Sequence, residues 1–373
     1  MVRSRRFRLL VALLLVFGLI AAACGDDDDT SAGGDDGAAS DDGAASDDGA
    51  ASDDGAADDG DEPMEMETVT LQLDWVPNTN HTGFFVADEL GYYADAGIEL
   101  EVLPYSGGNG DTIVAEGQAD FAISFQNSIT LARPVGVPIK AVAAVIQHTA
   151  EAIAVRGDRD DLNSPADLDG LLYAGFGGPF EVPVMTAVIQ AAGGEGEFDS
   201  VVLDTAAYEA VYNGSADFVI PFKTWEGVEA EITGQPLKYF EYADYGVPDH
   251  YSVIIVAGED FLADNADLAS RFLEATRMGF EFGAENPTEA GQMLIDANPG
   301  VFNEEELVFQ SQELMANEFF LADDGTWGCI ELDKFAAYSG FLYGANIVVD
   351  EGGDALTEEP DWSEFFDMTY LGC

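Results

Sequence analysis

The sequence has little positive charge, little cysteine and no long apolar run. Only 13 of its 373 residues are lysine or arginine, against 72 aspartates and glutamates, so the formal net charge is −59. Such a surface repels nucleic acid and anionic lipid, and we therefore expect no nucleic-acid partner. The acidic excess indicates a saline habitat or a need for solubility rather than a type of ligand.

The first apolar run, residues 9–20, follows four arginines and is too short to span a bilayer as a stable helix. Ala21, Ala22 and Ala23 precede Cys24, as in a bacterial lipobox, where the cysteine is diacylated and becomes the first mature residue. The alternative is an ordinary signal peptide cut nearby. We expect a lipoprotein signal peptide over residues 1–23 and a lipid anchor on Cys24, which would hold the protein at the outer face of a bacterial cell membrane.

The segment 24–66 repeats Asp-Asp-Gly-Ala-Ala-Ser and holds no basic residue. Its like charges repel and it offers nothing to bury, so we predict a disordered, extended tether. If Cys24 carries the lipid, Cys329 and Cys373 remain as a pair in an oxidising compartment. A disulfide between them is one interpretation, and two unpaired thiols are the other.

The remaining residues are enough for two lobes of about 150 residues each. Apolar strand patterns at 69–73, 98–103, 121–124 and 139–146 alternate with helical patterns, among them 84–94. A second alternating unit has strand patterns at 171–174, 201–204, 218–221 and 237–241. Such alternation implies parallel strands with crossover helices. We predict an α/β protein whose first lobe covers 67–155 and 251–373 and whose second lobe covers 156–250. The extended segments 151–155 and 251–257 would form the hinge.

Asp74 and Trp75 directly follow the first strand, and Asn78 and Asn80 follow them before a helix. Ligands of α/β sheets bind at the carboxyl ends of the strands, so this stretch is a candidate binding site. The alternatives are that Trp75 only closes the core and that Asp74 caps the next helix. His81 is a candidate for ligand contact or for a structural hydrogen bond.

A second candidate stretch, residues 175–181, contains Gly177, Gly178 and Glu181. A glycine-rich turn before a helix suggests a phosphate site. Glu181 argues against it, because its charge would occupy the positive end of the helix dipole and repel phosphate. The same carboxylate would accept a hydrogen bond from an amine. The alternative is a strand-to-helix turn whose glycines serve backbone geometry alone.

Three segments carry a family resemblance: Asp74-Trp75-Val76-Pro77-Asn78-Thr79-Asn80-His81-Thr82-Gly83, then residues 91–98, then Gly-Phe-Gly-Gly-Pro-Phe-Glu at 175–181. With Trp225-Glu226-Gly227 and the ending 367–371, they resemble the thiamine-pyrimidine-synthase-like solute-binding proteins of ABC importers. The similarity spans nearly all of 68–371. It implies a type II periplasmic-binding-protein fold, and a monomer that delivers a pyrimidine precursor of thiamine to an ABC permease. The precursor would be hydroxymethylpyrimidine or its formylaminomethyl relative.

An aminopyrimidine needs an aromatic plane and hydrogen-bond acceptors. We expect Trp75 to provide the plane and Glu181 to accept from the exocyclic amine, while Trp225 and Glu226 could add a second plane or acid. Asn127 ends another strand but could be only a helix cap. The complete set of predicted ligand-binding residues is Asp74, Trp75, Asn78, Asn80, His81, Asn127, Gly177, Gly178, Glu181, Tyr212, Trp225 and Glu226.

Two alternative functions remain, a binder of riboflavin or another heterocycle, and the pyrimidine synthase of the eukaryotic relatives. Those synthases consume a histidine, hold pyridoxal phosphate on a lysine and carry a cysteine-rich loop. Here residues 68–137 contain no lysine, and no cysteine lies between Cys24 and Cys329. We therefore expect no catalytic residue and no cofactor. Asp74, His81 and Glu181 lack metal-ligand spacing, so we expect no metal site.

Overall fold

The computed structural model describes residues 66–105, 107 and 109–373. The predicted signal peptide, Cys24 and the tether before residue 66 lie outside these residues. In the described part of the chain, no helix combines the length and the apolar character needed to cross a membrane.

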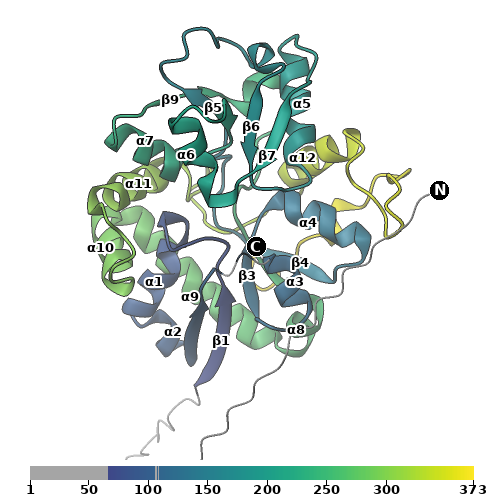
Figure 1. Ribbon diagram of the computed structural model, residues 1–373. Coiled ribbons are helices and arrows are strands. Elements are labelled where there is room, and N and C mark those ends of the chain that lie inside the picture. The colour runs from purple at the N-terminus through teal and green to yellow at the C-terminus, as the bar shows by residue number, and fades with distance from the viewer. Residues whose placement is uncertain (1–65, 106, 108) are drawn as a thin grey trace, which may run out of the picture. The chain divides into compact units, whose positions relative to one another are not determined.

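The first sheet has the strand order β2-β1-β3-β10-β4. Figure 1 labels β1, β3 and β4 of this sheet. β1 pairs in parallel with β2 and β3, whereas β10 is antiparallel to β3 and β4. β10 runs the other way because the chain enters it on its return from the second sheet. The strands are β1 Glu67–Gln72, β2 Ile98–Leu103, β3 Phe121–Ser124, β4 Ile139–Ala144 and β10 Ile254–Gly258.

The second sheet repeats this plan with the order β7-β6-β8-β5-β9. β6 is parallel to β7 and β8, and β5, which arrives from the first sheet, is antiparallel to β8 and β9. Both sheets are therefore mixed, although the sequence pattern predicted parallel strands. The strands are β5 Ile153–Arg156, β6 Leu172–Gly175, β7 Asp199–Val202, β8 Phe218–Val219 and β9 Leu237–Phe240.

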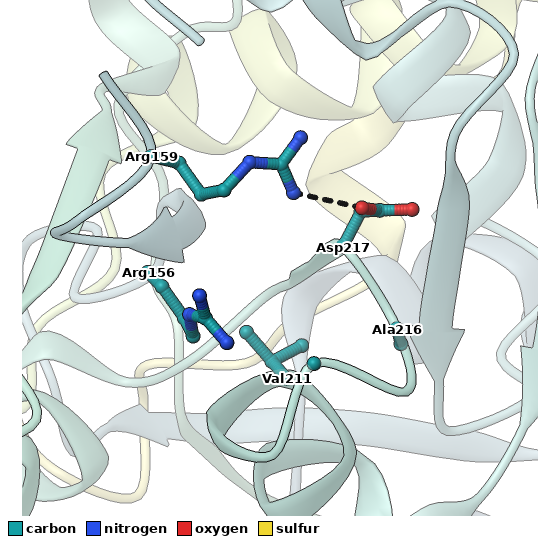
Figure 2. Close-up of a pocket in the computed structure, with 6 residues that line it drawn as sticks. Arg156, Arg159, Val211, Ala216 and Asp217 are labelled. Carbon is teal, nitrogen blue, oxygen red and sulfur yellow. Dashed lines mark hydrogen bonds and ion pairs between the residues drawn. The ribbon is translucent and has the colours of Figure 1, made fainter. Parts of the chain in front are cut away.

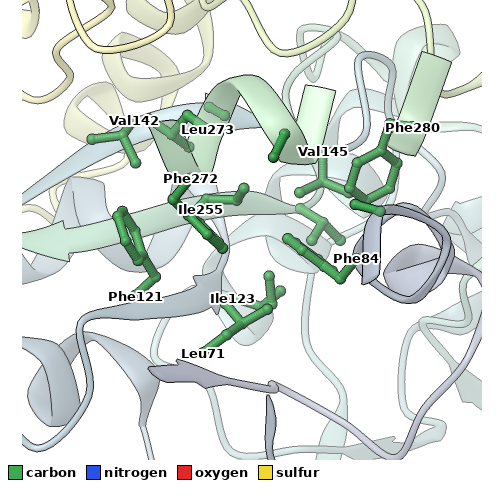
Figure 3. Close-up of a cluster of buried hydrophobic side chains, with 14 of the residues drawn as sticks. Leu71, Phe84, Phe121, Ile123, Val142, Val145, Ile255, Phe272, Leu273 and Phe280 are labelled. Atoms are coloured by element: carbon green, nitrogen blue, oxygen red, sulfur yellow. The ribbon is translucent and has the colours of Figure 1, made fainter. Parts of the chain in front are cut away.

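Helices cover both sheets. Phe84 from one helix and Phe272, Leu273 and Phe280 from another pack on buried strand residues such as Phe121 (Figure 3). Phe121 and Phe272 stack with their ring centroids 4.2 Å apart. The α-helices are α1 Thr82–Glu89, α2 Tyr92–Asp95, α3 Gly110–Ala115, α4 Gln126–Ala132, α5 Glu181–Ala191, α6 Ala207–Tyr212, α7 Val228–Ile232, α8 Glu259–Asp264, α9 Ala266–Glu285, α10 Pro287–Ala297, α11 Glu305–Glu318 and α12 Leu332–Gly344.

Two predicted elements differ from the structure. The single helix predicted at 84–94 is divided into α1 and α2, because Gly91 has φ of 78°, a left-handed conformation that ends a helix. The segments predicted as the hinge are mostly strands, since β5 starts at Ile153 and β10 at Ile254. The chain crosses between the sheets just before these strands, at residues 145–152 and 241–253.

The two crossing segments are hydrogen-bonded to each other. The backbone N–H of Val145 donates to Val253 O at 2.9 Å, and that of Ala150 donates to Ser252 Oγ at 2.9 Å. Asp249 accepts from Thr149 N and from Lys334 Nζ, which lies 2.6 Å away. The Lys334 ammonium and these N–H donors lower the pKa of the Asp249 carboxyl, against the effect of its burial.

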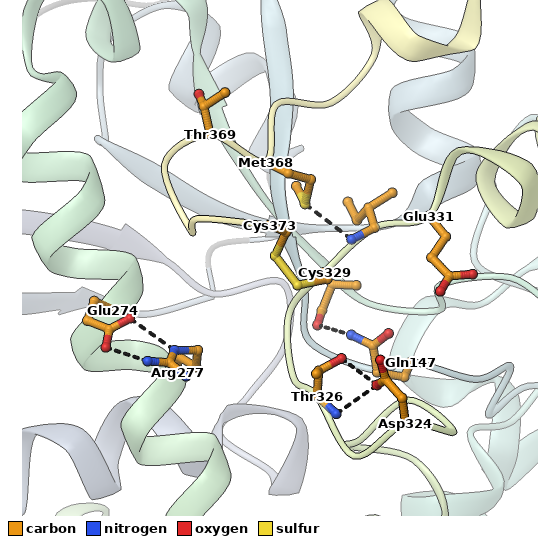
Figure 4. The surroundings of a disulfide bond; sticks show 12 residues. Gln147, Glu274, Arg277, Asp324, Thr326, Cys329, Glu331, Met368, Thr369 and Cys373 are labelled. Carbon is orange, nitrogen blue, oxygen red and sulfur yellow. Dashed lines mark hydrogen bonds and ion pairs between the residues drawn. A yellow bond between two sulfur atoms is a disulfide. The ribbon is translucent and has the colours of Figure 1, made fainter.

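Cys329 and Cys373 form a disulfide with 6.0 Å between their Cα atoms (Figure 4). It lies beside Met368, whose sulfur accepts from the Ile330 N–H at 3.1 Å. Ala141 in β4 forms an isolated parallel bridge with Phe366. The disulfide thus joins the last turn of the chain to the segment that precedes α12.

Candidate functional site

A cavity of about 550 Å³ lies between the loops of the two sheets. On one side it is lined by residues that follow β1, β2 and β3, and on the other by residues that follow β6, β7 and β8. These are the carboxyl ends of the parallel strands in both sheets, the position at which α/β folds bind ligands. Its volume lies within the usual range for small-molecule sites.

Trp75 is the centre of an aromatic group in this cavity. Its ring centroid lies 5.4 Å from that of Tyr105 and 6.4 Å from that of Phe176 across the cavity. Phe176 in turn lies 5.6 Å from Tyr208. The half-buried Trp75 therefore offers a ring face at a point where both walls of the cavity carry aromatic side chains.

His81 lies behind Asp74 instead of lining the cavity. It is fully buried, its Nδ1 accepts from the Asn78 N–H at 3.2 Å, and its Nε2 lies 2.8 Å from Asp74 Oδ1. Because Nδ1 accepts, the proton of the neutral ring is on Nε2 and points to Asp74. His81 therefore has the structural role that the sequence left open, and it orients the Asp74 carboxylate.

The three predicted asparagines that line the cavity differ in what their amides already bond. Asn78 Oδ1 accepts from the Asn80 N–H at 2.9 Å and so caps a short helical turn. Asn80 Oδ1 and Asn127 Oδ1 are buried and have no hydrogen-bond partner within the described protein. A buried acceptor without a donor is costly, so a donor that reached either oxygen would be favoured.

Glu181 binds the glycine-rich loop that precedes it. Its Oε2 accepts from Tyr173 Oη at 2.8 Å and from the Phe176 N–H at 3.0 Å, and its Oε1 accepts from the Gly178 N–H. Only 3% of the residue is exposed. A Cβ at Gly175 would lie 2.4 Å from Glu181 Oε2, so the loop needs glycine there. The N–H groups that could hold a phosphate therefore bind a carboxylate of the protein itself.

Glu226 lies in a π-helical turn, Lys223–Gly227, which precedes α7. It is 6% exposed, and its Oε2 accepts from the Phe222 N–H at 3.1 Å. Burial raises the pKa of the Glu226 carboxyl to about 8, although the Phe222 N–H and the Tyr208 hydroxyl lower it. Near neutral pH this group is a carboxylic acid that faces the cavity. Glu226 therefore has fewer hydrogen-bond donors around it than Glu181, the other predicted acceptor.

The structure brings ten of the twelve predicted ligand-binding residues to the cavity lining, while His81 and Tyr212 do not line it. Tyr212 only brings its hydroxyl to 3.5 Å from the Glu226 carbonyl oxygen. The sequence analysis missed several lining residues that also follow strand ends and could have been found by that rule. They include Tyr105 after β2, Asp204 after β7 and Phe222 after β8.

A second, smaller cavity of about 120 Å³ lies beside β5 (Figure 2). It holds two guanidinium groups, but each is already paired with carboxylates. Arg159 contacts Asp161 and, at 2.8 Å, Asp217, and Arg156 contacts Asp158. These pairs neutralise the positive charge, so this cavity is not a candidate anion site.

Two mixed α/β sheets, joined by two paired crossing segments and enclosing a cavity at the ends of their parallel strands, define a protein of the type II periplasmic-binding-protein fold. A solved structure from Staphylococcus aureus, the zinc-bound ligand-binding component of an ABC-type import system, superposes with a TM-score of 0.62 at 13% identity. The match covers 82% of this chain and 98% of that chain. At this identity the likeness shows the fold alone.

The chain belongs to the family described as NMT1/THI5 like, whose sequence profile matches residues 78–290. It is 31% identical over 235 residues to a formylaminopyrimidine-binding protein of Halalkalibacterium halodurans, a match that covers 62% of this chain and 70% of the relative. It is 27% identical to a 4-amino-5-hydroxymethyl-2-methylpyrimidine phosphate synthase of Legionella pneumophila, over 62% of this chain and 74% of that protein. The predicted fold and the predicted family are thus confirmed, and the family contains proteins named as binders and as enzymes.

Proposed function

We propose that this protein is an extracytoplasmic solute-binding lipoprotein of an ABC importer. It binds a pyrimidine precursor of thiamine, hydroxymethylpyrimidine or its formylaminomethyl relative, in the cavity between the two sheets. It then delivers this molecule to a membrane permease. The observation that carries the proposal is a cavity that combines aromatic faces with carboxylates and unpaired amide oxygens.

The donors and acceptors of the cavity match an aminopyrimidine. Trp75 provides a plane for the flat ring, and Asn80, Asn127 and Glu226 line the cavity with side chains that carry oxygen acceptors. The exocyclic amine of the ligand could donate to the two amide oxygens, which have no donor within the described protein. In contrast, a phosphate or sulfonate would meet acidic side chains, and the loop N–H groups that could bind it are taken by Glu181.

The residues that line the cavity favour a binder over the synthase. None of the lining residues in the described part of the chain is lysine, histidine or cysteine. A lysine-bound pyridoxal phosphate therefore has no attachment point there. The named synthases among the relatives keep this alternative open to test.

The proposed location depends on the N-terminal segment. A lipid on Cys24 and the acidic tether after it would hold the folded part outside the membrane, within reach of a permease. We expect the Cys24→Ala variant to leave the membrane fraction and to appear in the soluble fraction. Unchanged retention of that variant in membranes would show that the anchor is not on Cys24.

Mass spectrometry of the small molecule released by denaturing the purified protein tests the proposed ligand. We expect the mass of an aminopyrimidine. A yellow preparation that releases riboflavin would show that the site binds a flavin on the same fold. The absorbance of a pyridoxal phosphate Schiff base would instead support the synthase.

A further inference from the structure

The cavity contains five carboxylates and no basic side chain among its described lining residues. Asp74 comes from the first sheet, Glu151 from a crossing segment, and Glu181, Asp204 and Glu226 from the second sheet. Like charges this close repel one another, more strongly in a partly buried site than in water. A positive charge on a bound molecule would therefore be favoured in this cavity.

Four of the five carboxylates have their charge offset or lie in solvent. Asp74 accepts from His81, and Glu181 accepts from three donors. Glu151 Oε2 lies 3.5 Å from the buried Nε2 of His250, and Asp204 is exposed. Glu226 is buried, and its partners are neutral donors, the Phe222 N–H and the Tyr208 hydroxyl, so it is the carboxylate with the least compensation.

The groups around Glu226 on every neighbouring element are neutral or acidic. Tyr208 and Tyr212 approach it from α6, Tyr239 from β9 and Glu229 from α7. Lys223 lies in the same π-helical turn, but its ammonium is 2.7 Å from Glu241 and is half-exposed there. Burial without a cation or a full set of hydrogen-bond donors favours the protonated form of a carboxyl group, and the raised pKa of Glu226 agrees with this.

We infer that the cavity binds its flat heterocycle as a cation, with Glu226 and a basic ring nitrogen sharing one proton. This inference rests on the proposed function and specifies the chemical class of the ligand. In the empty cavity the proton is on the Glu226 carboxyl. On binding, its O–H bond breaks and an N–H bond forms, which leaves a carboxylate paired with a cationic ring.

The surroundings favour such an ion pair. The ring would lie among Trp75, Phe176 and Tyr208, whose faces attract cations, and the Asp74 carboxyl lines the same cavity. A charge-assisted hydrogen bond between a ring N–H and a carboxylate is also stronger than a neutral one. An isosteric ring without a basic nitrogen could not take the proton and would leave Glu226 unpaired.

Calorimetric titration of the purified protein with hydroxymethylpyrimidine, at several pH values and in two buffers of different ionisation enthalpy, tests this inference. Above a pH of about 8, the Glu226 carboxyl and the ring nitrogen are both deprotonated before binding. We therefore expect the complex to take up one proton from solution, and the affinity to fall about tenfold per pH unit. Below about pH 8, Glu226 already carries the proton that the ring takes up. We therefore expect no net proton uptake and an affinity that does not change with pH, until the free ring itself becomes protonated.

The Glu226→Gln variant should lose both the proton uptake and the pH dependence above 8, and bind more weakly. The matched control is Glu231→Gln, the same change on the exposed face of α7, which should behave as the wild type. If Glu226→Gln does not fold, Tyr208→Phe serves instead. It removes a hydroxyl that lowers the pKa of Glu226, so the fall in affinity should begin at a higher pH.

Two pyridine analogues, each with one ring nitrogen replaced by C–H, identify the nitrogen that takes the proton. We expect one analogue to bind with the affinity of the parent pyrimidine and the other to bind about 100-fold more weakly or worse. Equal binding of both analogues, or pH-independent binding of the pyrimidine without proton uptake, would overturn the inference while leaving the proposed function intact. Failure of the pyrimidine to bind at any pH would overturn the proposed function itself.

Discussion

At the scale of single residues, Glu181 shows how a residue predicted to contact the ligand can have a different task. Its carboxylate accepts from three donors in the loop before α5, so it holds the cavity wall in place. Glutamine would turn its amide N–H₂ toward one of these N–H groups. We expect Glu181→Gln to lower the free energy of unfolding by about 1–3 kcal/mol.

Urea unfolding and hydrogen exchange at residues 176–178 measure this effect. The control is Glu195→Gln, an exposed position beyond the same helix, for which we expect little change. If Glu181→Gln left the stability unchanged but abolished ligand binding, Glu181 would be the ligand acceptor that the sequence predicted.

Glu226 makes the stability of the empty protein depend on pH. Its folded pKa of about 8 lies above the ordinary value of a carboxyl, so the folded state binds more protons than the unfolded state between about pH 4.5 and 8. Stability from this group is present at low pH and is lost as the pH rises through 8. We expect Glu226→Gln to match the wild type near pH 5 and to exceed it at pH 9 by on the order of a few kcal/mol.

Chemical denaturation at a series of pH values, with the ligand removed, tests this expectation, and Glu231→Gln is again the control. A stability difference between Glu226→Gln and the wild type that is constant with pH would show that Glu226 is ionised throughout.

Residues directly after a strand could be predicted from the sequence, because the strand pattern alone locates the end of the sheet. Trp75 and Asn127 were found in this way and do line the cavity. His81 could not be separated from them, since only the fold reveals that its ring turns back to Asp74. The unpaired oxygen of Asn80 likewise depends on a backbone turn in which Asn78 makes the cap.

At the scale of elements, the periodic patterns predicted each described strand of both sheets to within a few residues. They did not predict strand direction, because an antiparallel β10 has the same apolar pattern as a parallel strand. Direction depends on where the chain crosses between the sheets. They also missed the break at Gly91, since a glycine inside a helical pattern can either continue or end the helix.

The disulfide is an element-scale contribution to stability. It closes a segment with a sequence separation of 44 residues. The chain-entropy relation for a loop of this length gives about 4 kcal/mol, and measured values for disulfides are typically about 2–4 kcal/mol. We expect reduction to lower the unfolding free energy by this amount and to increase hydrogen exchange in the last turn of the chain.

Thermal unfolding with and without reductant, together with mass analysis after alkylation, measures both effects. The Cys329→Ser/Cys373→Ser double variant should match the reduced protein and should not respond to reductant. Two alkylated thiols in the exported wild-type protein without reductant would show that the disulfide does not form there.

At the scale of the whole molecule, the net charge of −59 should make stability depend on salt. Repulsion between surface carboxylates opposes the compact state, and salt screens it over a length of about 10 Å at 0.1 M and about 3 Å at 1 M. We expect the unfolding temperature to rise between these concentrations, equally in NaCl and in KCl. An unchanged unfolding temperature would mean that the surface charges are already compensated.

The proposed binding of a ligand between the two sheets would also be a property of the whole molecule. Trp75 and Asn127 follow strands of the first sheet, and Phe176 and Glu226 follow strands of the second. If the two sheets can move apart, a molecule that contacts both sides would favour the arrangement in which they are close, because a ligand shifts a conformational equilibrium only through unequal affinity for its two states. Removing the contacts that either sheet makes with the ligand should therefore weaken binding.

The measurement that tests the central claim most directly is a calorimetric titration of the purified protein with three compounds, hydroxymethylpyrimidine, its formylaminomethyl relative and riboflavin. We predict one-to-one binding of a pyrimidine and none of riboflavin. Trp75→Phe should weaken pyrimidine binding modestly, since stacking contributes about 0.5–1.5 kcal/mol beyond area burial, and Trp75→Ala should weaken it most. Val76→Ala, at the exposed neighbouring position, should have no effect. Binding of riboflavin by a protein that binds neither pyrimidine would contradict the account.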